Sequence, residues 1–122
     1  MARTYLYVNA ALYLIFAIWC TISMVSTSRN LGYESLSANG RSEYLVIYGG
    51  LQLGLAITFW MLASNSSLHR FGILLSLAIY APIVLYRWIT VVKFGASGMT
   101  LGIACLESVL LLAAIGLRAN QS

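Results

Sequence analysis

Apolar residues in this chain gather into four long stretches that are separated by polar segments. The stretches lie at about residues 5–25, 44–63, 71–92 and 97–117. A helix needs about 20 apolar residues to cross the hydrocarbon core of a bilayer. None of the stretches alternates polar and apolar residues, as a membrane-spanning strand does. The pattern therefore predicts four transmembrane helices.

The polar segments between the stretches carry turn and cap residues: STSRNLGYESLSANGRS, SNSSLHR and KFGASG. The last two are short, so the helices they join are expected to be antiparallel neighbours. The first stretch exceeds the about 7–15 apolar residues of a secretory signal, so we expect a retained helix there. The prediction is one all-α domain over residues 1–122, an antiparallel four-helix transmembrane bundle.

Composition strengthens this prediction. Hydrophobic residues make up 61% of the 122 residues and charged residues only 8%, whereas a soluble domain carries about 25% charged residues. A soluble protein with this balance would lack polar material for its surface. We therefore expect an integral membrane protein, with the lipid bilayer as its main partner. The net charge of +4 is spread without a basic cluster, so no nucleic-acid partner is expected.

The charges near the ends of the stretches bear on orientation. With the N-terminus inside, the cytoplasmic face receives Arg3, His69, Arg70 and Arg118. The outer face then receives Arg29, Arg41, Lys93, Glu34 and Glu43. This weak positive-inside bias favours cytoplasmic N- and C-termini.

Two charged residues fall inside the predicted helices. Arg87 lies about 8 Å before the end of the third stretch, at about 1.5 Å per residue, and Glu107 lies near the middle of the fourth. The short loop between these stretches puts both residues in the same half of the bilayer. An unpaired charge near the centre costs about 2.5–3.5 kcal/mol on insertion scales. We predict an Arg87–Glu107 pair; a snorkelling arginine and a protonated glutamate are the alternatives.

Further polar residues are expected in the same half of the bundle. Glu43 stands at the mouth of the second stretch, and Tyr44, Tyr48 and Gln52 follow at a spacing of four residues, on one helical face. Tyr80 precedes Arg87 by two helical turns. The candidate ligand-binding set is therefore Glu43, Tyr44, Tyr48, Gln52, Tyr80, Arg87 and Glu107. These residues form either a pocket open to one membrane face or a hydrogen-bond network that only fixes the fold.

The cysteines, the single histidine and the glycine motifs do not indicate a catalytic or metal site. Cys20 and Cys105 lie in apolar runs without metal-ligand spacing, and the single histidine, His69, has no second ligand nearby. We expect no metal and no cofactor. Two GxxxG motifs, at 50–54 and 98–102, allow close helix contact either within the chain or between chains.

EYLVIYGGLQLGL in the second stretch, LYRW in the third, the following loop glycine (Gly95 or Gly98) and CLES in the fourth together form a pattern. Over about residues 41–118 it resembles a bacterial family of small four-helix membrane proteins of unknown function, DoxX-like in build. The resemblance implies a four-helix bundle in a bacterial inner membrane. It implies no activity, so the matching residues carry over only as motif positions: Glu43, Tyr48, Gly49, Gly50, Arg87 and Glu107.

Three functional hypotheses remain open. The first is a protein that binds a lipophilic small molecule, such as a quinone or a lipid, or serves as an accessory subunit of a membrane complex or homo-oligomer. The second is a membrane-embedded enzyme in which Glu43 or Glu107 acts as general acid or base and Tyr48 assists. The third is a small proton-coupled transporter. The first helix lacks the glutamate of small multidrug exporters, which disfavours the third.

Overall fold

The computed structural model describes residues 1–121, and within them the chain is helical, without strands. In chain order the helices are α1 (Ala2–Ile22), α2 (Met24–Asn30), α3 (Ala38–Tyr44), η1 (Leu45–Leu51), α4 (Gln52–Ser64), η2 (Ser66–Leu68), α5 (His69–Phe94) and α6 (Gly98–Gln121). The segment η1 is a π-helix, and it joins α3 to α4 without a break.

Four helical stretches are long and apolar enough to cross a membrane: Ala2–Ile22, Ala38–Ser64, Ser66–Phe94 and Gly98–Gln121. This confirms the predicted all-helical class and the four long apolar helices. The bounds differ because helical hydrogen bonding continues beyond the apolar run. The second stretch begins at α3, where the Ser37 hydroxyl caps the helix by accepting from the Gly40 N–H at 3.1 Å.

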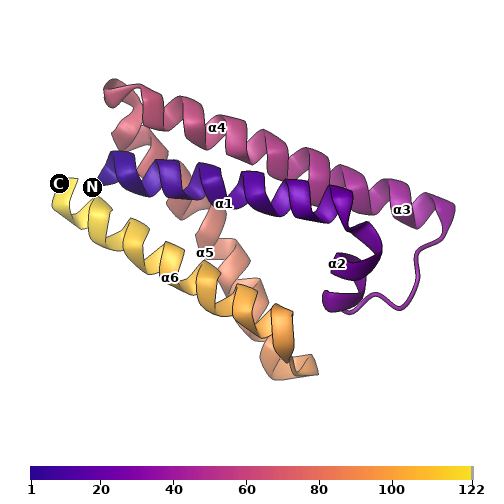
Figure 1. Ribbon diagram of the computed structural model, residues 1–122. Helices are drawn as coiled ribbons and strands as arrows, with labels where there is room; N and C mark the ends of the chain where they lie inside the picture. The colour runs from indigo at the N-terminus through magenta and orange to yellow at the C-terminus, as the bar shows by residue number, and fades with distance from the viewer. Residues whose placement is uncertain (122) are drawn as a thin grey trace.

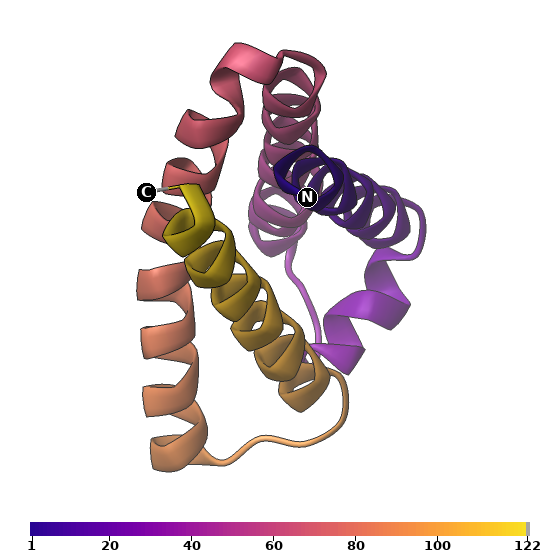
Figure 2. The same ribbon diagram turned by 90° about the vertical axis from the view of Figure 1, so that its left-hand side faces the viewer.

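The first stretch ends earlier than predicted, at Ile22 and not near residue 25, because the helix breaks at Ser23 and the chain turns into α2. Figures 1 and 2 show α2 leaving the line of α1. Its residue Thr27 is fully buried, and the Thr27 hydroxyl accepts a hydrogen bond of 2.8 Å from the Tyr44 hydroxyl. The connection after the first helix is therefore tied to the second stretch.

The long helices associate as two pairs (Figure 1). Helix α1 packs most extensively on α4, and α5 on α6. Within the first pair the Tyr7 and Ser64 hydroxyls lie 3.2 Å apart, and Tyr13 stacks on Phe59 with centroids 5.7 Å apart. Since Tyr7 and Ser64 stand at the start of α1 and the end of α4, these two helices run in opposite directions.

The second pair also runs in opposite directions. Gly95 ends α5 with a φ of +79°, a backbone conformation that favours glycine, and the chain returns as α6. The return brings the Trp88 indole N–H to the Ser108 hydroxyl at 2.8 Å.

The hydrophobic core joins the two pairs at the end where both termini lie (Figure 2). The buried residues of α5 are Gly72, Ile73, Ser76 and Tyr80, all in the first half of that helix. From there α5 diverges from α1 and α4 in Figure 2, while α2 contacts α6. The side chains in the second half of α5 are consequently half-buried or exposed.

Candidate functional site

An ion pair joins the second helix pair in the half of the molecule away from the termini. The Arg87 side chain, from α5, places Nη2 2.7 Å and Nε 2.9 Å from Oε1 of Glu107, from α6. It is the one salt bridge within residues 1–121. The contact predicted from the helix depths is therefore present.

The two partners differ in exposure. The Glu107 side chain is 11% exposed, whereas that of Arg87 is 33% exposed. Both guanidinium contacts use the same carboxylate oxygen, and the other guanidinium N–H groups of Arg87 have no protein acceptor in the described chain. A guanidinium carries five N–H donors and no acceptor. Within residues 1–121 the pair therefore leaves hydrogen-bonding capacity unfilled on the guanidinium and on the second carboxylate oxygen.

An aromatic cluster forms where η1 faces the end of the first helix and the loop after α2. Tyr44 and Tyr48 stack with centroids 4.6 Å apart, and Tyr33 meets both edge-on, at 5.9 and 6.5 Å. The hydroxyls of Tyr33 and Tyr48 lie 3.3 Å apart. The cluster therefore ties α3 and η1 to the loop after α2.

The π-helix accounts for much of this local arrangement. Its turns are wider than those of an α-helix. Such segments are rare in proteins, and those that occur often lie at functional sites. Gly49 lets η1 approach α1, because a Cβ there would lie 2.8 Å from the Thr21 hydroxyl oxygen. Gln52 donates its amide N–H to the Ile47 carbonyl in η1, at 3.5 Å. The Gln52 side chain thus bonds to the backbone of its own helical stretch and makes no hydrogen bond to the other candidate residues.

Tyr80 belongs to a second, deeper network. It is 1% exposed and donates a hydrogen bond to Oδ1 of Asn9, whose amide donates to the Tyr5 carbonyl at 2.9 Å. The Tyr5 hydroxyl donates to the Leu110 carbonyl at 2.9 Å. This network links α1, α5 and α6 through the core.

Glu43 stands apart from both groups. It is exposed on α3 and makes no hydrogen bond or ion pair within residues 1–121. The structure therefore joins Arg87 and Glu107 directly, gathers Tyr44 and Tyr48 in the aromatic cluster and places Tyr80 in the core network with Asn9. Glu43 and Gln52 make no hydrogen bond to any of them within residues 1–121. No group of three or more histidine, cysteine or acidic residues that could hold a metal occurs in the described part of the chain.

Sequence reasoning missed Tyr33 and Thr27 as neighbours of Tyr44. Both lie in the connection after the first helix, for which the sequence predicted only turn and cap residues. Its aromatic and small polar residues were the available signal. The π-helix was missed as well, although the paired glycines Gly49 and Gly50 mark its position.

Comparison of the chain with protein-family models, curated proteins and solved structures found no match. The resemblance to DoxX-like proteins therefore stays a prediction. The functional argument depends on the site itself.

Proposed function

We propose that the chain is an integral membrane protein whose helices form an antiparallel transmembrane bundle, in a bacterial inner membrane as the family resemblance implies. Its outer surface supports this location. Large apolar side chains are exposed on every long helix, among them Ile15 (63%), Ile57 (52%), Leu85 (59%) and Leu112 (66%). Such a surface would drive aggregation in water, whereas lipid tails solvate it.

The distribution of charge supports cytoplasmic termini. Arg3, Arg70 and Arg118 lie at the start of α1, the start of α5 and the end of α6, which gather at one end of the molecule (Figure 1). The acidic residues Glu34 and Glu43 lie in the loop before α3 and in α3, at the other end. The end that carries the termini thus has Arg3, Arg70 and Arg118 with His69, against Arg29, Arg41 and Lys93 at the other end. This weak positive-inside bias favours cytoplasmic termini.

Alkaline carbonate extraction and terminal reporters test the location. Full-length protein expressed in a bacterium should stay in the membrane pellet after extraction, because its helices are solvated by lipid. A C-terminal green fluorescent protein should fluoresce, whereas a C-terminal alkaline phosphatase should be inactive. Release into the supernatant would contradict membrane insertion. An active phosphatase with a dark fluorescent protein would reverse the orientation only.

We further propose that the bundle holds a lipophilic small molecule with a polar head, such as a quinone or a lipid, against the Arg87–Glu107 pair. The carrying observation is the half-satisfied guanidinium of Arg87. Within a bilayer, unfilled donors are costly because no bulk water reaches them. A carbonyl or phosphate oxygen of a ligand would fill them. Membrane-embedded charges are functional candidates by default.

Native mass spectrometry from nanodiscs tests this ligand hypothesis. Wild-type protein should carry a stoichiometric lipophilic mass. The variant Arg87→Gln/Glu107→Gln should lose that mass, since it removes the guanidinium while leaving no unpaired charge. Arg70→Gln removes one arginine at the other end of the molecule and should keep the mass. Retention of the mass by the double variant, or its absence from wild-type protein, would contradict binding at this pair.

The same spectra address the accessory-subunit alternative, which the exposed apolar faces favour. A copurifying chain or a defined homo-oligomer without a small molecule would support that function instead. The enzyme hypothesis has less support from the site. Its candidate base Glu107 is occupied by Arg87, and its candidate Glu43 stands alone on an exposed helix.

A further inference from the structure

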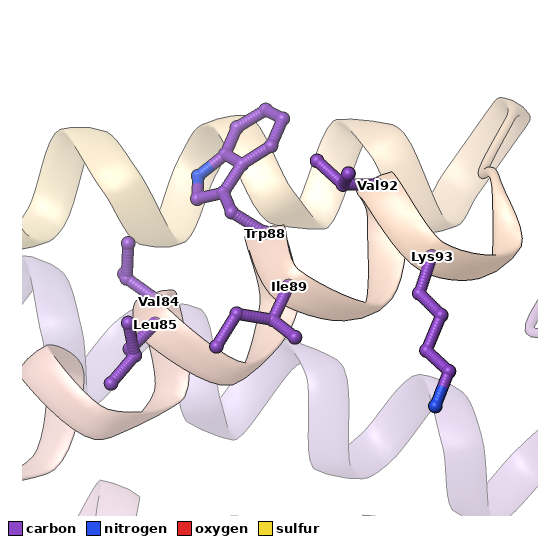
Figure 3. A pocket seen from close by; sticks show the side chains of 6 residues that line it. All are labelled: Val84, Leu85, Trp88, Ile89, Val92 and Lys93. Atoms are coloured by element: carbon purple, nitrogen blue, oxygen red, sulfur yellow. The ribbon is translucent and has the colours of Figure 1, made fainter.

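A groove runs along the outer face of α5, in the half of the helix that diverges from the core (Figure 3). It is a hollow of about 650 Å³ that is largely open to the surroundings. Its lining consists of Val84, Leu85, Trp88, Ile89, Val92 and Lys93. Neither Arg87 nor Glu107 lines it, so it is separate from the ion-pair site.

The lining residues follow one strip of the helix, in neighbouring pairs that recur every four residues. From Val84 to Lys93 the strip rises about 14 Å, at about 1.5 Å per residue. Half of a hydrocarbon core of about 30 Å is about 15 Å. Lys93 stands next to the final residue of α5, and Val84 lies near the middle of that helix. The groove therefore has the length of one leaflet and runs from the interface toward the bilayer centre.

The polar groups of the groove lie toward its interfacial end. Lys93 is the only charged residue in the lining, and its ammonium lies 5.3 Å from the centroid of the Phe94 ring, without a salt bridge in the described chain. The Trp88 indole N–H is already bonded to Ser108, which leaves its ring as an apolar wall (Figure 3). An apolar channel with a cation at one end complements an amphiphile with an anionic head.

We propose that this groove binds one anionic phospholipid, with an acyl chain along Val84–Val92 and the phosphate on Lys93. The proposal rests on the membrane location proposed above, but it is independent of any ligand at Arg87. Basic residues near a membrane surface each contribute about 1 kcal/mol to the binding of anionic lipid. That corresponds to about a fivefold preference over a zwitterionic lipid of the same chain length.

Quenching of Trp88 fluorescence by brominated lipids tests the proposal. Trp19 and Trp60 are both exposed, so Trp19→Phe/Trp60→Phe leaves Trp88 as the reporter in an intact chain. The protein is placed in phosphatidylcholine vesicles that contain a minor fraction of brominated lipid. Brominated phosphatidylglycerol should quench Trp88 with about fivefold higher apparent affinity than brominated phosphatidylcholine.

Two charge variants separate the groove from general attraction to the surface. Lys93→Gln should abolish the preference for phosphatidylglycerol while quenching by phosphatidylcholine continues. Arg41→Gln removes one exposed positive charge at the same end of the molecule but outside the groove, and it should keep the preference. If the two variants lost the preference for phosphatidylglycerol equally, the proposal would be overturned. Equal quenching of the reporter protein by both lipids would overturn it as well.

A second copy of the chain is the competing occupant. Weak quenching by both lipids, together with a dimer in native mass spectra, would overturn the lipid site in favour of that contact. Absence of quenching by any lipid would overturn it too, and would bring the membrane location into question. Quenching without lipid preference leaves the membrane location standing, so the two failures are distinguishable.

Discussion

Glu107→Gln is expected to lower the free energy of unfolding by about 2 kcal/mol. Removing one partner of a buried ion pair costs about 3–5 kcal/mol, and we expect less here because the Arg87 side chain is one-third exposed. The variant leaves a cation without its counter-charge in an apolar environment. Denaturation of the purified protein in mild detergent, followed by circular dichroism, measures the loss.

Two further variants decide whether this loss comes from pairing. Arg87→Gln/Glu107→Gln should be more stable than Glu107→Gln, because it removes the uncompensated cation. Glu43→Gln makes the same substitution at an exposed glutamate without an ion pair and should change stability by less than about 0.5 kcal/mol. A double variant no better than the worse single variant would refute the energetic importance of the pair.

Gly72→Ala should destabilise the fold by about 1–3 kcal/mol, the usual cost of overpacking a core. A Cβ at Gly72 would lie 2.8 Å from Cδ1 of Leu6 and 3.4 Å from Cβ of Leu62. Leu6 is fully buried, so its methyl groups have little room to move. The added methyl group would push α5 away from α1 and α4, at the place where the two helix pairs meet. Detergent denaturation again provides the measurement.

Gly54→Ala is the matched control for this prediction. Gly54 lies inside α4, and nothing lies within 4 Å of a Cβ built there. Alanine is favoured over glycine within a helix by about 1 kcal/mol, so this variant should be as stable as wild-type protein or more stable. If Gly72→Ala were also stabilising, the close packing of α5 on α1 would not limit the fold.

The glycine motifs illustrate the limits of local patterns. The sequence contains GxxxG at residues 50–54 and 98–102, yet a Cβ at any of these four glycines would meet nothing within 4 Å. The close contacts within the chain occur instead at Gly49 and Gly72, which belong to neither motif. A GxxxG motif indicates that one face of a helix carries small residues. Which face turns toward a neighbour depends on the rotation of the helix about its axis.

The ion pair could be predicted from the sequence because its prediction did not depend on how each helix is rotated about its axis. Its prediction needed only the depth of each residue along its helix and a short connection between the helices. A rise of about 1.5 Å per residue fixes both depths. The long, flexible arginine side chain can reach a carboxylate whose depth differs from its own by several ångströms. Because an unpaired charge is costly in an apolar environment, the two charged side chains are expected to pair.

Tyr80 and Gln52 make contacts that their depth along the helix did not predict. Tyr80 was grouped with Arg87 because two helical turns separate them, yet its hydroxyl meets Asn9 on α1. Gln52 was placed on the face of Tyr44 and Tyr48 by α-helical spacing. The intervening π-helix alters that spacing, and Gln52 bonds within its own helix.

The number of long helices, their apolar surfaces and the Arg87–Glu107 contact were predicted from the amino-acid sequence. These properties follow from composition, helix length and depth, which are local quantities. The path of α2 away from the line of α1, the contact of Tyr33 with Tyr44 and Tyr48, and the packing of α5 through Gly72 near one end became visible in the three-dimensional packing. Such contacts depend on how whole helices rotate and tilt against one another, and that choice is made by the packing of many side chains at once.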